Sequence, residues 1–321
     1  MLQPNELKSE LPMDIANDAV ATTTTVWKLL VACYNGNINA VKEMVKVQPE
    51  LLYAQYNYTP PIHLAVREGH IELVNYLLKK GAYAPNYKTY PFGDSLETIA
   101  EDRNYNEIAV LLKDYTAHPE RQKFSGDNGR IHFKRNELQA EFEKAVDNND
   151  VNKTEKILKE NPVFALDETY FWGEGILMMP AKENHRNMID VLMQYGAKVP
   201  AILKWTQYYY FEHNDGAKYM MAKGMSPNTM SWHHVTILHD MAQKGNIEKA
   251  ELLIQYGANI NAVEEEYQST PLAMAARWGH IEMVQYLLKQ GADIKKAGAS
   301  WATPLAWAKK KGYAAIEKIL S

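Results

Sequence analysis

The amino-acid sequence predicts an all-α solenoid, in which pairs of helices stack side by side. Three stretches, 61–82, 237–261 and 271–294, are near copies of one another. Each contains two helix-length segments, and apolar residues recur in them at helical spacing, as at Ile281, Val284 and Leu288. A lone pair of helices cannot bury such a face. Stacked neighbours bury it between them, so the repetition itself predicts the architecture.

A glycine between the two helices marks the same point in each copy. Glycine suits this point because the backbone must turn into positive φ where the first helix ends. Prolines such as Pro61 and Pro271 suit the start of the first helix, where the missing N–H is harmless. We expect about nine helix pairs, because equivalent marks fall at Gly36, Gly69, Asn104, Asn149, Asn184, Glu212, Gly245, Gly279 and Gly312.

Two intervals between these marks depart from the period. Asn104 and Asn149 are too far apart, which indicates an insertion, and Asn184 and Glu212 are too close for a normal hairpin. Polar residues such as Glu317 and Lys318 favour a cap that ends the stack. The expected parts are a polar N-terminal extension at 1–25, repeats 1–3 at 26–115, an insertion or linker at 116–136, degenerate repeats 4–6 at 137–235, and regular repeats 7–9 with a C-terminal cap at 236–321.

Together, the Thr-Pro-like starts, the Gly-His turns, the Leu-Leu pairs and the closing Gly-Ala pairs resemble the ankyrin repeat. The stretch PIHLAVREGHIELVNYLLKKGA and its copies carry this resemblance. It implies a curved stack whose concave side is formed by the first helices and the hairpin tips. It also implies a non-catalytic scaffold that binds another protein on that side, although such stacks bind many unrelated partners.

Composition narrows the remaining classes of function. The net charge of −4 and the pI near 6.2 give no reason to expect a nucleic-acid partner. The chain has no apolar run long enough for a membrane helix, and residues 1–25 lack the basic start and apolar core of a secretory signal. We expect a monomeric cytoplasmic protein without membrane contact, with a secreted effector as the alternative.

Catalysis has no support in the sequence. We find no glycine-rich phosphate loop, no G-x-S-x-G and no H-E-x-x-H. The histidines at 233, 234 and 239 are expected to be structural rather than metal ligands, and the acids at 264–266 are expected to form a solvated hairpin tip. Cys33, the only cysteine, is expected to be buried and inert. We therefore expect no enzyme activity, no cofactor and no metal.

Binding is expected where large aromatic and arginine side chains lie on first helices and hairpins, because these residue types dominate interface hot spots. The predicted surface is an aromatic groove flanked by arginines. The expected partner-binding residues are Tyr34, Arg67, Arg103, Trp172, Tyr210, Phe211, Trp232, Arg277, Trp278 and Trp301. The alternative is a small-molecule or metal-binding module at the irregular 196–235 junction, with a pocket among Trp205, Tyr209, His213 and His233.

Overall fold

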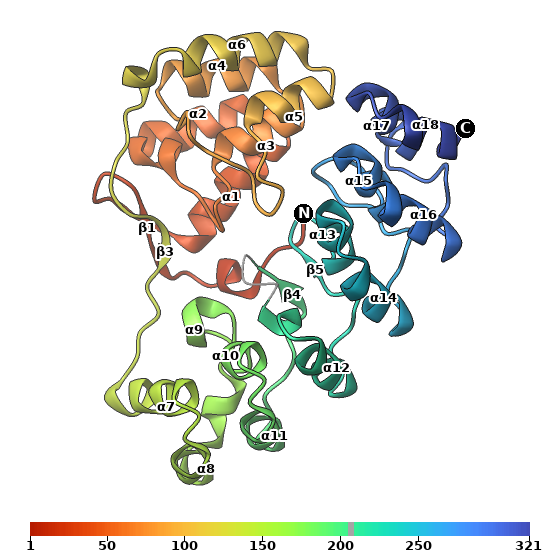
Figure 1. Cartoon of the computed structure of the whole chain (residues 1–321). Coiled ribbons are helices and arrows are strands. Elements are labelled where there is room, and N and C mark those ends of the chain that lie inside the picture. The colour runs from red at the N-terminus through yellow and green to blue at the C-terminus, as the bar shows by residue number, and fades with distance from the viewer. Residues whose placement is uncertain (205–208) are drawn as a thin grey trace. The chain divides into compact units, whose positions relative to one another are not determined.

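A computed structural model describes residues 1–204 and 209–321, which fall into two compact units. The N-terminal unit comprises residues 3–133, and the C-terminal unit comprises residues 134–321 with residues 1–2. Each unit consists mainly of helix pairs, as the repeats in the sequence predict (Figure 1). Among the described residues, no helix has the length and apolar character needed to cross a bilayer.

The N-terminal unit has two layers of helices (Figure 1). In each pair the first helix lies beside the first helices of the neighbouring pairs, and the second helices α4 and α6 also lie side by side. We call the two sides of a unit the first-helix layer and the second-helix layer. The helices are α1 (Thr23–Tyr34), α2 (Ile38–Val47), α3 (Pro61–Arg67), α4 (Ile71–Lys79), α5 (Leu96–Asp102) and α6 (Asn106–Thr116), and short 3-10 turns are η1 (Asn5–Lys8), η2 (Pro49–Tyr53) and η3 (Pro119–Arg121).

A small sheet joins the N-terminal extension to the insertion. Strand β1 (Pro12–Ile15) pairs antiparallel with β2 (Val20–Thr22) and with β3 (Asn128–Ile131). Met13 and Ile15 of β1 are fully buried, so the polar extension contributes to the core of this unit. The side chain of Asn128 accepts the N–H of Gln55 at 3.1 Å, which ties β3 to the repeats.

The C-terminal unit repeats the layered arrangement. Helices α13, α15 and α17 lie side by side as first helices, and α16 lies beside α18. Before the sixth mark, Glu212, the described residues of the expected first helix form only the turn η5. This agrees with the short interval between Asn184 and Glu212. The elements are α7 (Glu137–Asp147), α8 (Val151–Glu160), η4 (Pro162–Leu166), α9 (Tyr170–Gly173), α10 (Met178–Lys182), α11 (Arg186–Gln194), β4 (Ile202–Leu203), η5 (Tyr209–Phe211), α12 (Asn214–Ala222), β5 (Met230–Ser231), α13 (Ile237–Lys244), α14 (Ile247–Gln255), α15 (Pro271–Trp278), α16 (Ile281–Lys289), η6 (Ser300–Ala302), α17 (Pro304–Lys311) and α18 (Ala314–Leu320).

The marks read from the sequence are left-handed residues in the structure. Eight of the nine have φ between 55° and 79°, and Glu212 is the exception. The residue after the mark then ties neighbouring repeats together: Nε2 of His70 lies 2.8 Å from the carbonyl oxygen of Tyr34, and Nε2 of His280 lies 2.6 Å from that of Gln243. The predicted turn between the helices is confirmed at these eight positions.

Two equivalent glycines at second-helix ends give a matched test of how the insertion packs. Gly81 and Gly257 both have positive φ, at 79° and 89°. A Cβ on Gly81 would lie 2.5 Å from the backbone oxygen of Arg121, whereas a Cβ on Gly257 meets nothing within 4 Å. Gly257→Ala should cost about 1–2 kcal/mol through its φ alone, and Gly81→Ala about 1 kcal/mol more through overpacking. Denaturant unfolding of both variants measures the difference, and equal losses would contradict it.

Candidate functional site in the aromatic and arginine clusters

An arginine enclosed by aromatic rings lies at the end of α15 in the C-terminal unit. The guanidinium of Arg277 is 3.8 Å from the ring centroid of Trp278 and 3.9 Å from that of Tyr267. Arg277 itself is only 4% exposed. Cation–π attraction is strong when both groups are shielded from water. The buried guanidinium therefore packs against these rings and holds them in place. The prediction that Arg277 is exposed on the flank of a groove is wrong.

The same cluster is completed by Trp307 of α17. Its Nε1 donates a hydrogen bond of 2.8 Å to Oγ of Ser269. Its ring meets Trp301 edge-on with centroids 5.7 Å apart, and Tyr267 with centroids 6.0 Å apart. Trp307 is fully buried, whereas Trp301 and Trp278 are half-buried. The cluster thus presents part of two indole rings on a rigid base.

The arginines of the N-terminal unit also have structural partners. Arg67 Nε lies 2.7 Å from Glu68 Oε1, and its guanidinium lies 5.5 Å from the ring centroid of Tyr34. Arg103 Nη1 donates to the carbonyl oxygen of Arg67 at 2.7 Å. Arg67 and Arg103 are buried, so their predicted exposure is wrong, and Tyr34 is half-buried. Because Arg277 belongs to the other unit, the structure does not place the three arginines around one groove.

Three further aromatic residues of the predicted surface are buried. Tyr210 is 2% exposed, Phe211 1% and Trp232 2%. Tyr210 and Phe211 lie in η5, which packs against α10 and α12, and the hydroxyl of Tyr210 donates to the carbonyl oxygen of Glu174 at 3.3 Å. Burial also raises the pKa of Tyr210. The expectation of exposure fails because a short turn replaces a solvated helix end at this point of the stack.

Trp172 is the exposed member of the predicted set. Its side chain is 69% exposed, and its backbone is left-handed, with φ of 60°. The neighbouring Phe171 is also left-handed but is buried, and its N–H donates to Oε1 of Glu143 at 2.7 Å. Left-handed backbone is rare for bulky residues and persists only where the surroundings impose it. The fold therefore holds a tryptophan ring in solvent at an energetic cost.

Tyr58 has the same two properties in the N-terminal unit, and the predicted set does not contain it. Its side chain is 52% exposed and its φ is 61°. It lies in a tight turn closed by a bridge between Tyr56 and Thr59. The preceding Asn57 is a residue type that favours left-handed turns, and it was the sequence signal for this exposed tip.

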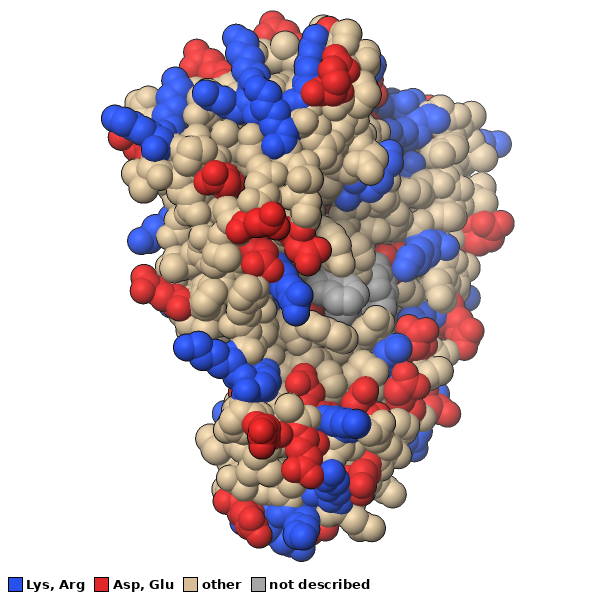
Figure 2. All heavy atoms as spheres, turned by 90° about the vertical axis from the view of Figure 1, so that its left-hand side faces the viewer, with Lys and Arg blue, Asp and Glu red and all other residues tan. Residues whose placement is uncertain are grey.

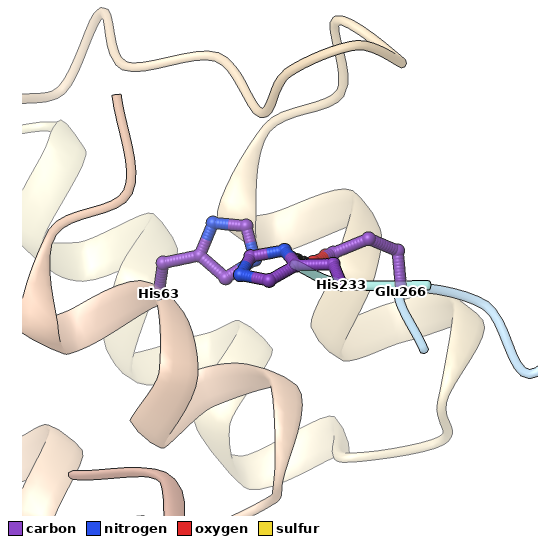
Figure 3. A group of neighbouring side chains, drawn as sticks. All are labelled: His63, His233 and Glu266. Atoms are coloured by element: carbon purple, nitrogen blue, oxygen red, sulfur yellow. Dashed lines mark ion pairs between the residues drawn. The ribbon is translucent and has the colours of Figure 1, made fainter. Parts of the chain in front are cut away.

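The acidic hairpin is not a solvated tip. Glu264 and Glu266 are 1% and 0% exposed. The carboxylate of Glu264 accepts the N–H groups of Glu266, Tyr267 and Ser269 at 2.6–3.1 Å. Figure 3 shows the imidazole of His233 facing the Glu266 carboxylate, with Nδ1 2.5 Å from Oε1. The prediction was wrong because Glu264 accepts backbone N–H groups within the turn and Glu266 pairs with His233 of another hairpin.

The histidine of α13 is structural, as predicted. Nδ1 of His239 lies 2.8 Å from Oγ1 of Thr236, and Nε2 lies within 3.2 Å of the carbonyl oxygens of Ala262 and Ser269. Burial lowers its pKa to about 4. His63, which Figure 3 also labels, belongs to the N-terminal unit, where its Nδ1 lies 2.7 Å from the hydroxyl of Tyr87. Cys33 is buried as expected, and burial raises the pKa of its thiol.

The alternative pocket at the 196–235 junction gains no support from its described members. Trp205 lies outside the described residues. The ring of Tyr209 lies 5.0 Å from Nζ of Lys182, and His213 is exposed where α12 begins. His233 pairs with Glu266, as above. This alternative stays a prediction.

Positive and negative side chains are mixed on the face of the molecule that Figure 2 draws. On the face drawn in Figure 2, Lys and Arg are interspersed with Asp and Glu over the described residues. A nucleic-acid surface carries a continuous basic stripe instead. The described residues on this face form no such stripe.

Similarity to known proteins identifies the repeats. A family model for ankyrin repeats (3 copies) matches residues 27–89 and 206–298. A mouse protein described as fem-1 homolog A-like is 33% identical over 81 residues, which is 25% of this chain and 12% of that protein. The chain thus contains ankyrin repeats, which indicate a protein–protein interaction module.

Several relatives are enzymes by name. The palmitoyltransferase ZDHHC17 of Danio rerio is 34% identical over 92 residues, and the mouse liver isoform of mitochondrial glutaminase is 30% identical over 95 residues. These matches cover 29% and 28% of this chain but only 14% and 15% of the two relatives. The chain spans a small part of each, and ankyrin repeats are generally not enzymes, so neither activity is carried over.

Proposed function

We propose, from the ankyrin repeats that this chain contains, that it is a non-catalytic scaffold that binds a partner protein through exposed aromatic side chains of its first-helix layer and hairpins. The observation that carries the proposal is Trp172, which is 69% exposed on left-handed backbone. Exposed indole rings on a rigid base are the usual anchors of protein interfaces, because they bury much area and lose little rotamer freedom.

Other aromatic residues extend the proposed binding surface within each unit. In the C-terminal unit, Trp278 is half-buried against the enclosed Arg277, and Trp301 is half-buried against Trp307. Tyr34 and Tyr58 are half-buried and exposed, respectively, in the N-terminal unit. In this proposal Arg67 positions Tyr34, Arg277 positions Trp278, and Arg103 holds the backbone of Arg67. Tyr210, Phe211 and Trp232 stabilise the fold and have no binding role.

A capture experiment with matched variants tests the proposal. Trp172→Asn removes the ring and suits left-handed backbone, since asparagine adopts it more readily than tryptophan. The control is Tyr256→Ala, which removes an aromatic side chain that is 44% exposed at the end of α14. We expect Trp172→Asn to capture at least about tenfold less of the partner proteins than the wild-type chain captures. Tyr256→Ala should capture the same amount as the wild type. Equal recovery with both variants would refute the role of Trp172.

A further inference from the structure

The second-helix layer of the N-terminal unit contains an apolar groove between α4 and α6, which lie side by side (Figure 1). The groove has a volume of about 620 Å³. A groove of this size is in the range that accommodates a ligand or a few side chains. Its lining includes Ile71, Glu72, Asn75, Glu107, Val110 and Leu111. Within this unit it lies on the second-helix layer, whereas Tyr34 belongs to the first-helix layer.

Val110 is out of place in the repeat pattern. It lies six residues after the mark Asn104 and is 66% exposed. The equivalent residue is polar or charged in the eight other copies: Lys42, Asn75, Glu155, Asp190, Lys218, Glu251, Gln285 and Lys318. One exposed valine is ordinary, and valine is a poorer helix former than lysine or glutamine. Only this copy places an apolar residue there, and that residue lines the groove.

Two carboxylates flank the apolar lining. Glu72 and Glu107 occupy the first turns of α4 and α6, and both are exposed. No ion pair among residues 1–204 and 209–321 involves either of them. Asp114, one turn beyond Val110, is instead paired with Arg121 at 2.7 Å. Acidic residues in the first turn of a helix also interact favourably with the helix dipole, so the two glutamates alone do not indicate a ligand. Their combination with the apolar groove does.

We propose that this groove binds a peptide segment of a partner protein that combines an aliphatic side chain with an adjacent lysine or arginine. The aliphatic side chain lies against Ile71, Val110 and Leu111. The cation lies beside Glu72 and Glu107, where the charges are complementary. A segment laid along a groove between helices is a common mode of peptide recognition. This interface is independent of the one proposed for Trp172.

The test is a selection from a displayed library of random 16-residue peptides against the immobilised full chain. Selected peptides are then synthesised, and their affinities are measured by fluorescence anisotropy. We expect peptides that pair leucine, isoleucine or valine with lysine or arginine. Val110→Lys should weaken their binding at least about tenfold by placing a charge in the groove. Glu72→Gln with Glu107→Gln should weaken it about threefold, and less at high salt.

Matched controls lie on α2 in the same layer. Val47 is 86% exposed, so Val47→Lys adds the same charge away from the groove, and Glu43→Gln removes an exposed carboxylate. Neither control should change affinity, and Val110→Lys should leave Tm unchanged. The proposal is overturned if the library yields no peptide that depends on Val110, or if the selected peptides lack basic residues. If the chain self-associates and Val110→Lys abolishes that association, the groove binds a second copy of the chain, and the peptide proposal is overturned.

Discussion

Replacing Trp307 by alanine is expected to lower the free energy of unfolding of the C-terminal repeats by about 4 kcal/mol. The side chain is fully buried, contacts Tyr267 and Trp301, and donates a hydrogen bond to Ser269. Truncation would leave a large cavity and remove the hydrogen bond that Oγ of Ser269 accepts, and both effects destabilise. Denaturant unfolding followed by circular dichroism measures the loss without relying on the tryptophan that has been removed.

Trp307→Phe provides the control for this prediction. Phenylalanine keeps a ring against Tyr267 but cannot donate to Ser269, so we expect a loss of about 1–2 kcal/mol. A stack loses stability locally, because each repeat contacts only its neighbours. Hydrogen exchange should therefore show the loss of protection in α15–α18 first. A change below about 1 kcal/mol for Trp307→Ala would contradict the buried cluster.

The second large effect is a dependence of stability on pH that comes from His239. Its pKa is lowered from 6.5 to about 4 in the folded chain, so the unfolded chain takes up the proton first as the pH falls. The stability that the neutral imidazole contributes is fully present above pH 6.5 and is lost as the pH falls from 6.5 to 4. The pKa difference corresponds to about 3 kcal/mol in total, of which about 2 kcal/mol is lost between pH 7 and pH 5.

The comparison with His239→Gln isolates this contribution from other titrating groups. The variant should be less stable at pH 7, since glutamine cannot reproduce all the contacts to Thr236, Ala262 and Ser269. Its stability should nevertheless fall by about 2 kcal/mol less than that of the wild type between pH 7 and pH 5. His213→Gln, at an exposed position, should leave the wild-type dependence unchanged. Parallel pH curves for His239→Gln and the wild type would show that His239 is not the source.

Local signals in the sequence predicted the repeats well. Gly and Asn at the marks specify left-handed residues, and eight of the nine adopt them. Glu212, the exception, follows η5, where the interval between marks is too short. These features depend on a few neighbouring residues, so periodicity alone identifies them.

Features that depend on distant parts of the chain were not predicted. Met13 of β1 pairs with Ile131 of β3 across most of the N-terminal unit, and neither short strand has a sequence pattern of its own. The burial of Glu266 depends on His233 from another hairpin. The predicted binding residues assumed that aromatic side chains before a mark face solvent. Tyr210, chosen as such a residue, packs inward, whereas Trp172, chosen as a hairpin aromatic, faces solvent on left-handed backbone, and the sequence does not distinguish the two.

The most direct test of the proposed function is the equilibrium affinity of a purified captured partner for the wild-type chain and for Trp172→Asn. Partner binding through the exposed indole ring predicts that Trp172→Asn raises Kd at least about tenfold. The Tm should not fall, because the side chain is mostly in solvent and asparagine adopts left-handed backbone more readily than tryptophan. An unchanged Kd for Trp172→Asn, with a partner that the wild type binds specifically, would contradict the proposal.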